Sequence, residues 1–412
     1  MSETMYIARS KEAEMFERGE CGGSVTSILK HALNSGLVDG VVAVQGKNGD
    51  RFAGIPVLLT APEQLIETAG ALHCSTPNIA RFVKLYLDGA SSMKLAVVGK
   101  PCDIKAIIEL EKRNQINSDN LILIGLNCSG TLSPAKAKMM LRNEFCVDPD
   151  TVVKEDIDDG ELTIFLTDGT QKSMDLAKLE KKGYGRRENC RRCETKIPTM
   201  ADIACGKWGT EHLNPPGTFI EICSEKGRQL IENAIGAGII EVVVPDEKSI
   251  VTRKQKVQTE IEQSIECIDN DLKPLMELSE PEKLEYWLSE FNKCIKCFGC
   301  RDACPICYCD NCLLEANREY LQKGTVPPKI VFPLTRLSHV ADSCVNCGQC
   351  QDVCPMELPL SRLYTLLHKK LSAIFDYHPG MNVEETPPLL AITEEEKLVD
   401  NTFLDLSLID QS

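Results

Sequence analysis

Two cysteine-rich stretches decide the architecture of this chain: CIKCFGCRDACPICYCDNC at residues 294–312 and CVNCGQCQDVCP at residues 344–355. Each contains the spacing C-x2-C-x2-C-x3-C-P, which is typical of a pair of [4Fe–4S] clusters. In that arrangement the fourth cysteine of each arm binds the cluster of the other arm. The pattern therefore predicts one cluster on Cys294, Cys297, Cys300 and Cys354 and a second on Cys344, Cys347, Cys350 and Cys304.

Paired C-x2-C motifs also bind zinc, but two complete arms favour iron–sulfur clusters over zinc. The 412 residues include 21 cysteines, and the formal net charge is −15. Cysteines in such number without a secretory signal indicate a reducing, cytoplasmic location. The acidic balance and the absence of a basic stripe argue against nucleic acid as a partner. No run of 18 apolar residues is present, so we expect no membrane insertion.

The N-terminal part contains a glycine-rich turn that opens a helix. Gly22 and Gly23 precede Ser24, and the apolar residues of ILKHAL (28–33) follow with helical spacing. Backbone N–H groups at such a helix start can hold a phosphate. An ordinary capped helix is the alternative, because no G-x-G-x-x-G or Walker motif is present. Strands are expected at 38–45 and 51–60, joined by the turn KNGD.

Two strand–turn–helix units follow, at 94–110 and 121–145, and they predict a partly parallel sheet. Each turn carries a cysteine where the chain leaves a strand, Cys102 in the first and Cys128 in the second. Crevices at such strand ends bind ligands in open α/β sheets. A buried structural thiol is the alternative for either cysteine. A small hairpin is expected at 151–180, with its turn at Asp168 and Gly169.

A third cysteine group lies at residues 183–211. Cys190 and Cys193 form a C-x2-C pair, and Cys205 follows in a turn flanked by glycine. A zinc knuckle or free thiols are the alternatives to an iron–sulfur site. Four arginines surround the pair in an otherwise acidic chain, and they either offset the charge of a cluster or phosphate or form a solvated face. They are Arg186, Arg187, Arg191 and Arg192.

Some residues fit no pattern. Cys307, Cys309 and Cys312 exceed the eight thiolates that two clusters need, and the sequence assigns them no role. The six histidines form no metal or catalytic motif, and we expect no catalytic side chain. The expected organisation is a core in two parts, 1–90 and 91–250, a helical linker at 251–293, a ferredoxin-like domain at 294–374 and an acidic tail at 375–412.

Four motifs, in order, resemble a known family: CGGSVTSILKHAL (21–33), GKPCDIKAI (99–107), GLNCSG (125–130) and ENCRRCETKIPTMADIACGKWG (188–209). They are similar to the β subunits of coenzyme F420-reducing hydrogenase and of F420-dependent formate dehydrogenase. With the two cysteine arms, the resemblance covers nearly the whole chain. The CPICYC insert resembles the formate dehydrogenase branch more closely.

The resemblance implies an α/β (α+β) flavin-binding core with a C-terminal 2×[4Fe–4S] ferredoxin-like domain. It implies bound FAD, a third [4Fe–4S] cluster in the core, and coenzyme F420 as substrate. Its motifs place FAD phosphates at Gly22, Gly23, Ser24 and Thr26, and phosphate or the anionic tail of F420 at Lys100, Arg186 and Arg187. The core cluster is expected on Cys190, Cys193 and Cys128, with a fourth ligand from Cys205 or Cys102 and preference for Cys205.

In this reading, formate is oxidised on a molybdenum- or tungsten-containing α subunit, and electrons pass through the clusters and FAD to F420 as hydride. Heterodisulfide reductase or hydrogenase subunits are further expected partners. One alternative is the corresponding subunit of an F420H2 dehydrogenase or F420-reducing hydrogenase. The other is a non-enzymatic electron-transfer subunit that carries clusters only.

Overall fold

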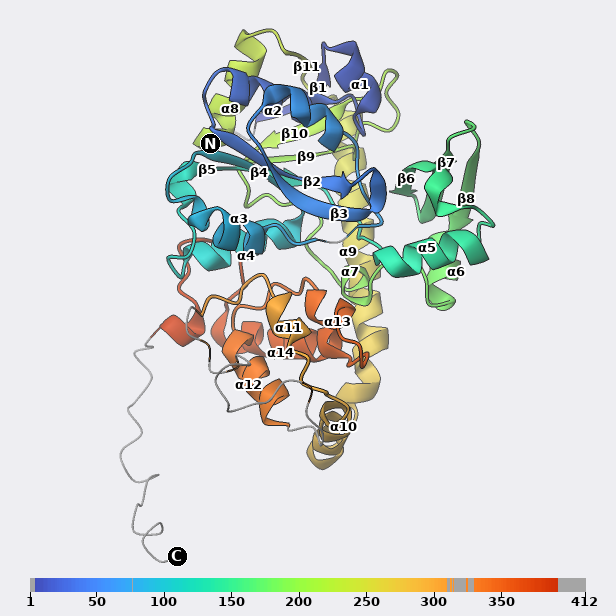
Figure 1. The fold of residues 1–412 in the computed structure, drawn as a ribbon, viewed down its shortest axis with the longest axis vertical. Coiled ribbons are helices and arrows are strands. Elements are labelled where there is room, and N and C mark those ends of the chain that lie inside the picture. Colours follow the sequence, from blue (N-terminus) through green and yellow to red (C-terminus); the bar gives the residue numbers. More distant parts are fainter. Residues whose placement is uncertain are drawn as a thin grey trace, which may run out of the picture.

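A mixed eight-stranded sheet forms the centre of the N-terminal region in this computed structural model (Figure 1). The structure describes residues 4–391 except 76, 310–311, 313, 315–323 and 325–329. The four strands β2, β4, β5 and β9 run parallel, and the remaining pairings are antiparallel, which confirms the predicted partly parallel sheet. In spatial order the strands are β11 (Ile240–Val243), β1 (Thr4–Ser10), β10 (Thr218–Ile222), β9 (Ile203–Gly206), β5 (Leu121–Leu126), β4 (Leu95–Gly99), β2 (Gly40–Lys47) and β3 (Asp50–Leu59).

Alternate side chains of the strands fill two separate cores, as the period of two requires. Leu95 and Val97 of β4 pack on one face, and Ala96 packs on the other. Helices α2 (Ser24–Asn34) and α8 (Glu225–Gly236) cover the face of Ala96. Helices α3 (Ala80–Tyr86) and α4 (Pro101–Glu111) cover the face of Leu95. Short helix α1 (Ala13–Arg18) lies against α2.

A second, three-stranded antiparallel sheet projects to one side of the first (Figure 1). Its β7–β8 turn contains Asp168 and Gly169, as the sequence predicts. Helices from both ends of the segment pack on it around their own apolar cluster. The elements are α5 (Pro134–Asn143), β6 (Val152–Asp158), β7 (Glu161–Leu166), β8 (Gln171–Asp175) and α6 (Leu176–Lys181).

The C-terminal region packs beneath α3 and α4 (Figure 1). Long helix α9 (Glu247–Met276) runs down from the sheet and contacts both α7 (Glu188–Arg191) and α14 (Leu360–Phe375). Two ion pairs join α9 to the core. Arg192 pairs with Asp271 at 2.5 Å, and Lys196 pairs with Glu260 at 3.6 Å. The other helices here are α10 (Glu280–Asn292), α11 (Gly299–Asp302), α12 (Val331–Val340) and α13 (Gln349–Asp352).

The two cysteine arms have the same backbone course. Lys296 and Phe298 of the first arm have φ angles of 52° and 65°, and the equivalent Asn346 and Gly348 have 51° and 71°. These left-handed residues curl each arm into a loop before its short helix, α11 or α13. The short spacing therefore turns three thiols of one arm toward a common centre.

The core docks on the second arm through close backbone contacts. The Asn189 side chain donates from Nδ2 to the carbonyl oxygen of Asn346 at 2.9 Å. A Cβ at Gly348 would lie 1.8 Å from Oδ1 of Asn189, so only glycine allows this approach. Asn189 directly precedes Cys190 in the chain. Its contact with the second arm therefore brings the core cysteines close to the ferredoxin-like part.

No helix among the described residues is long and apolar enough to cross a bilayer. The predicted domain boundaries remain predictions, and residues 392–412 of the predicted acidic tail lie outside the described residues.

Candidate functional site

Each predicted four-cysteine set of the two arms surrounds its own small cavity. Cys294, Cys297 and Cys300 line one together with Cys354 of the other arm. The second is lined by Cys344, Cys347, Cys350 and Cys304. Burial raises the pKa of Cys300 to about 12 and that of Cys344 to about 12, and the nearby thiols add to this. Such thiols need a metal charge to ionise, as iron provides in a cubane.

A third group of thiols forms where the core meets the second arm. Cys128 interacts electrostatically with Cys190 and Cys193, and Cys102 interacts with Cys128 and with Cys347 of the second arm. The segment after Cys128 can pack closely against Cys190 because residue 130 is glycine; a Cβ at Gly130 would lie 3.1 Å from Cβ of Cys190. The structure thus gathers four thiols from three separate segments of the chain, the number that one cubane requires.

Cys205, which the sequence analysis preferred as fourth ligand, does not join this group. It lies on β9 opposite Leu126 of β5, buried among the apolar residues under α2 and α8. Its thiol interacts with Cys21, Arg253 and Cys223 instead. The side chains of a strand alternate between faces, and the position of Cys205 in β9 sends its thiol away from Cys190.

The main candidate binding site is a cavity of about 260 Å³ between the glycine-rich turn and the strand ends. The ends of β4 and β5 contribute Lys100 and Cys128, which places this cavity beside the third thiol group. Gly23, Ser24 and Thr26 line it from the other side. Open α/β sheets bind ligands at such carboxyl ends of parallel strands.

The start of α2 has the features of a phosphate site. The Ser24 hydroxyl is fully buried and has no hydrogen-bond partner, although it faces the cavity. Gly23 has φ of 68°, and a Cβ there would lie 2.0 Å from the carbonyl oxygen of Met15. The first N–H groups of a helix lack internal partners and favour an anion. Gly22 shapes this turn with φ of 82° but does not line the cavity.

Lys100 is the cation at the opposite wall. Its Nζ donates to Oδ2 of Asp103 at 2.7 Å and to the carbonyl oxygen of Pro77 at 3.0 Å. Although burial opposes its charge, Asp103 and the thiols of Cys102 and Cys128 raise the pKa of Lys100. The amine is therefore charged and fixed in position between the cavity and the thiol group.

Arg186 and Arg187 are not among the residues that line the cavity, although Arg186 donates from Nη1 to the carbonyl oxygen of Ser129, which does line it, at 3.2 Å; their role beside phosphate or F420 stays a prediction. Arg186 Nε pairs with Glu180 at 2.8 Å, and its Nη1 lies 3.6 Å from Glu260. Arg187 pairs with Asp352 and donates from Nη1 to the sulfur of Cys190 at 3.9 Å. Arg187 therefore lies against a thiol of the core, whereas Arg186 is held by two carboxylates.

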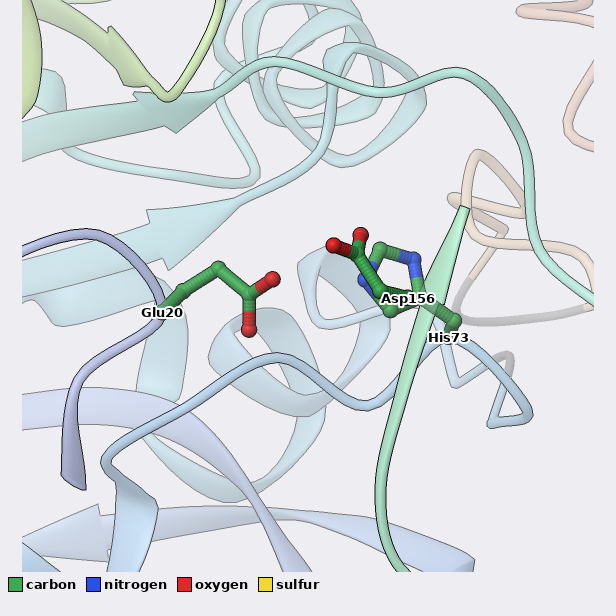
Figure 2. A group of neighbouring side chains, drawn as sticks. All are labelled: Glu20, His73 and Asp156. Atoms are coloured by element: carbon green, nitrogen blue, oxygen red, sulfur yellow. The ribbon is translucent and has the colours of Figure 1, made fainter. Parts of the chain in front are cut away.

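The structure brings His73 into a polar group that the sequence did not indicate. Figure 2 shows the carboxylates of Glu20 and Asp156 turned toward the His73 ring, and one ligand atom of each lies within 4.8 Å of the others. Glu20 and His73 line the cavity. Lys207 pairs with Asp156 at 2.5 Å, and Lys154 lies 3.7 Å from Glu20. These amines already offset the charge of the two carboxylates. The group is therefore better suited to polar contacts with a ligand than to binding a metal cation.

Three protein-family models match this chain. Residues 5–81 match the model of the coenzyme F420 hydrogenase/dehydrogenase β subunit N-terminus, and residues 92–248 match that of its C terminus. Residues 290–358 match a 4Fe–4S dicluster domain. The chain is 45% identical to the F420-dependent formate dehydrogenase subunit beta of Methanocaldococcus jannaschii, over 94% of this chain and 98% of the relative. The chain belongs to the coenzyme F420 hydrogenase/dehydrogenase β-subunit family.

Other relatives of this family member include the F420-dependent formate dehydrogenase 1 subunit beta of Methanococcus maripaludis, 43% identical over 95% of this chain and 98% of the relative. The coenzyme F420 hydrogenase subunit beta of Methanococcus voltae is 29% identical over 63% of this chain and 94% of the relative. The fold resembles a chain of the F420-reducing [NiFe] hydrogenase complex from Methanosarcina barkeri, with a TM-score of 0.56 and 19% identity over 65% of this chain and 91% of that chain. A mixed α/β fold with a C-terminal 4Fe–4S dicluster domain is therefore established, and the formate dehydrogenase relatives are oxidoreductase subunits.

Proposed function

We propose that this chain is the electron-transferring β subunit of an F420-dependent formate dehydrogenase. Formate would be oxidised on a molybdenum- or tungsten-containing partner subunit, and the electrons would leave this chain as hydride on coenzyme F420. The relatives named as formate dehydrogenase subunits align over 94% and 95% of this chain, whereas the hydrogenase subunit of Methanococcus voltae aligns over 63%. This difference favours the formate dehydrogenase branch.

The order of the thiol groups is the observation that carries the proposal. The cavities of the two four-cysteine sets share Arg336 and Tyr364 in their linings, and Arg187 donates both to the carbonyl oxygen of Cys347 in the second set, at 2.9 Å, and to the sulfur of Cys190 in the core, at 3.9 Å. Cys128 of the core lines the cavity. The groups thus stand in series from the ferredoxin-like part to the cavity, as an electron relay requires.

The residues of the three thiol sets and of the cavity have the chemistry needed to bind clusters and FAD, respectively. Cubanes at the three thiol sets would supply one-electron transfer, and FAD in the cavity would supply the change between single electrons and hydride. We assign Cys102, in place of Cys205, as the fourth ligand of the core cluster with Cys128, Cys190 and Cys193. The start of α2 at Gly23, Ser24 and Thr26 would hold phosphate, and Lys100 would hold a second anionic group.

The polar group of Figure 2 has a task in this scheme. Electrons arrive without protons, but two electrons leave as a hydride and F420 gains a further proton when it is reduced. His73 lies at the cavity wall with Glu20, and its Nε2 is buried without a hydrogen-bond partner. His73 is therefore placed to pass a proton between Glu20 and the cavity.

The deciding experiment is anaerobic purification of the chain, with flavin, iron and sulfide counted per chain, followed by addition of reduced F420. We expect bound FAD, about twelve iron atoms for three cubanes, and bleaching of the flavin and cluster absorbance. Absence of flavin and of any response to F420 would leave a cluster relay only. Formate is then added together with the molybdenum- or tungsten-containing partner subunit. Reduction of the flavin and clusters of this chain would indicate a formate dehydrogenase, and no reduction would favour an F420H2 dehydrogenase.

A further inference from the structure

Thr131 links the core thiol group to the cavity. The residue lines the cavity and is only 5% exposed. Its Oγ1 lies 3.8 Å from the sulfur of Cys190, which is within hydrogen-bond range for sulfur. The hydroxyl therefore lies between a thiol assigned to the core cluster and the space assigned to FAD.

Backbone contacts hold Thr131 in place. Its carbonyl oxygen accepts from the N–H of Arg187 at 3.0 Å, and the next residue, Leu132, forms a β-bridge with Arg186. Gly130, on the other side, has φ of 127°, a left-handed conformation that favours glycine. The segment 130–132 thus runs beside the segment that leads to the C-x2-C pair, and the backbone fixes where the hydroxyl lies.

The charge of Cys190 decides the direction of this hydrogen bond. A thiol and a hydroxyl can each donate, but a thiolate bound to iron has no proton. The Thr131 hydroxyl is then the donor and the sulfur is the acceptor. A hydrogen bond to a ligating sulfur withdraws negative charge from it, so it stabilises the reduced form of a cluster, which carries one more electron.

We propose that Thr131 is a positioning residue that raises the reduction potential of the core cluster through Cys190, on the side that faces the cavity. This role rests on the proposed function, since it needs a cluster on Cys190. Arg187 also donates to this sulfur, but it contacts the second arm as well, through the carbonyl oxygen of Cys347. Thr131 contacts the core thiol group and the cavity, so its effect is expected on the core cluster and not on the second one.

The test compares Thr131→Val with Thr131→Ser in the full chain, purified anaerobically with its clusters. Valine replaces the hydroxyl with a methyl group of similar size, which would lie in ordinary van der Waals contact with the sulfur, whereas serine keeps the hydroxyl. Potentiometric titration followed by electron paramagnetic resonance measures each cluster, and the core signal is the one that Cys102→Ser lacks. In Thr131→Val the reduction equilibrium of the core cluster should shift about tenfold toward the oxidised form, which is about 59 mV for one electron.

Thr131→Ser and the second cluster of Thr131→Val should both keep the wild-type potential. Thr218→Val is the matched control. Thr218 is also a buried threonine at the cavity wall, but its Oγ1 lies 3.5 Å from the sulfur of Cys21, which belongs to no cluster set. It should leave the core potential unchanged. Thr131→Ala removes the hydroxyl without adding a second methyl group, so it gives the same test where valine displaces the cluster.

The outcomes separate this role from the proposed function. An unchanged core potential in Thr131→Val and Thr131→Ala, or an equal fall in Thr131→Ser or Thr218→Val, would overturn the role of Thr131. About eight iron atoms per wild-type chain, with no core signal, would overturn it together with the core cluster. A core signal that shifts in Thr131→Val, in a chain that binds no flavin and does not respond to F420, would support the role of Thr131 and overturn the proposed function alone.

Discussion

Arg187 donates from Nη2 to the carbonyl oxygen of Cys347 at 2.9 Å and from Nη1 to the sulfur of Cys190 at 3.9 Å. One buried guanidinium thus joins the second arm of the ferredoxin-like part to the core thiol group. Its ion pair with Asp352 of α13 holds it there. Burial opposes its charge, but Cys190, Asp352 and Cys347 together raise the pKa of Arg187. The contact between the two parts of the relay is therefore electrostatic as well as steric.

Replacing Arg187 with Met should lower the reduction potentials of the core and second clusters. A unit charge within about 5 Å contributes about 3 kcal/mol at an effective dielectric constant of about 20, and its loss disfavours the reduced, more negative cluster. Potentiometric titration followed by electron paramagnetic resonance measures the shift. Arg228→Met is the control, because that arginine lies on α8, which covers the face of the sheet opposite α3 and α4. Unchanged potentials in Arg187→Met would show that the guanidinium serves packing alone.

Cys102→Ser and Cys205→Ser separate the two candidates for the fourth core ligand. Cys102→Ser should reduce the iron content from about twelve to about eight atoms per chain, because serine seldom replaces a thiolate on a cubane. Cys205→Ser should keep about twelve, since its thiol lies among apolar residues on the opposite face of the sheet. Iron and sulfide analysis with the optical spectrum of each variant decides the matter. The reverse pattern would return the ligand role to Cys205.

Gly23→Ala should abolish flavin binding. The added Cβ would lie 2.0 Å from the Met15 carbonyl oxygen at a φ of 68°, so the turn before α2 must move. Gly36→Ala is a matched control, with φ of 69° and open space around it, and should cost only about 1 kcal/mol of stability. Flavin content and the unfolding midpoint of each variant are the measurements. Equal flavin content in the two variants would place the phosphate elsewhere.

Stability should fall as the pH drops from about 6.5 toward 4 because of His368. Burial, with Lys105 and His378 nearby, lowers the pKa of His368 to about 4. The unfolded chain binds a proton near pH 6.5 and the folded chain does not, so acid favours unfolding in this window. Allowing for partial exposure, the effect is about 2 kcal/mol.

Anaerobic denaturant titrations between pH 7 and pH 5 measure this effect. His368→Gln should flatten the dependence, whereas His212→Gln, at an exposed position, should not. An unchanged slope in His368→Gln would assign the acid sensitivity to other groups.

Short-range features were readable from the sequence because each depends on spacing within a few residues. The two cysteine arms, the glycine turn before α2 and the strand–turn–helix units around Cys102 and Cys128 all have this character. Their order also identified the family.

Tertiary structure alone decided which of these segments meet. Cys205 is nearer to Cys193 in sequence than Cys102 is, but its position in β9 turns its thiol to the other face of the sheet. The docking of Asn189 under Gly348 turns Arg187 toward Cys347 and away from the cavity. His73 meets Glu20 and Asp156 only because three distant segments converge, and no local pattern records such long-range contacts.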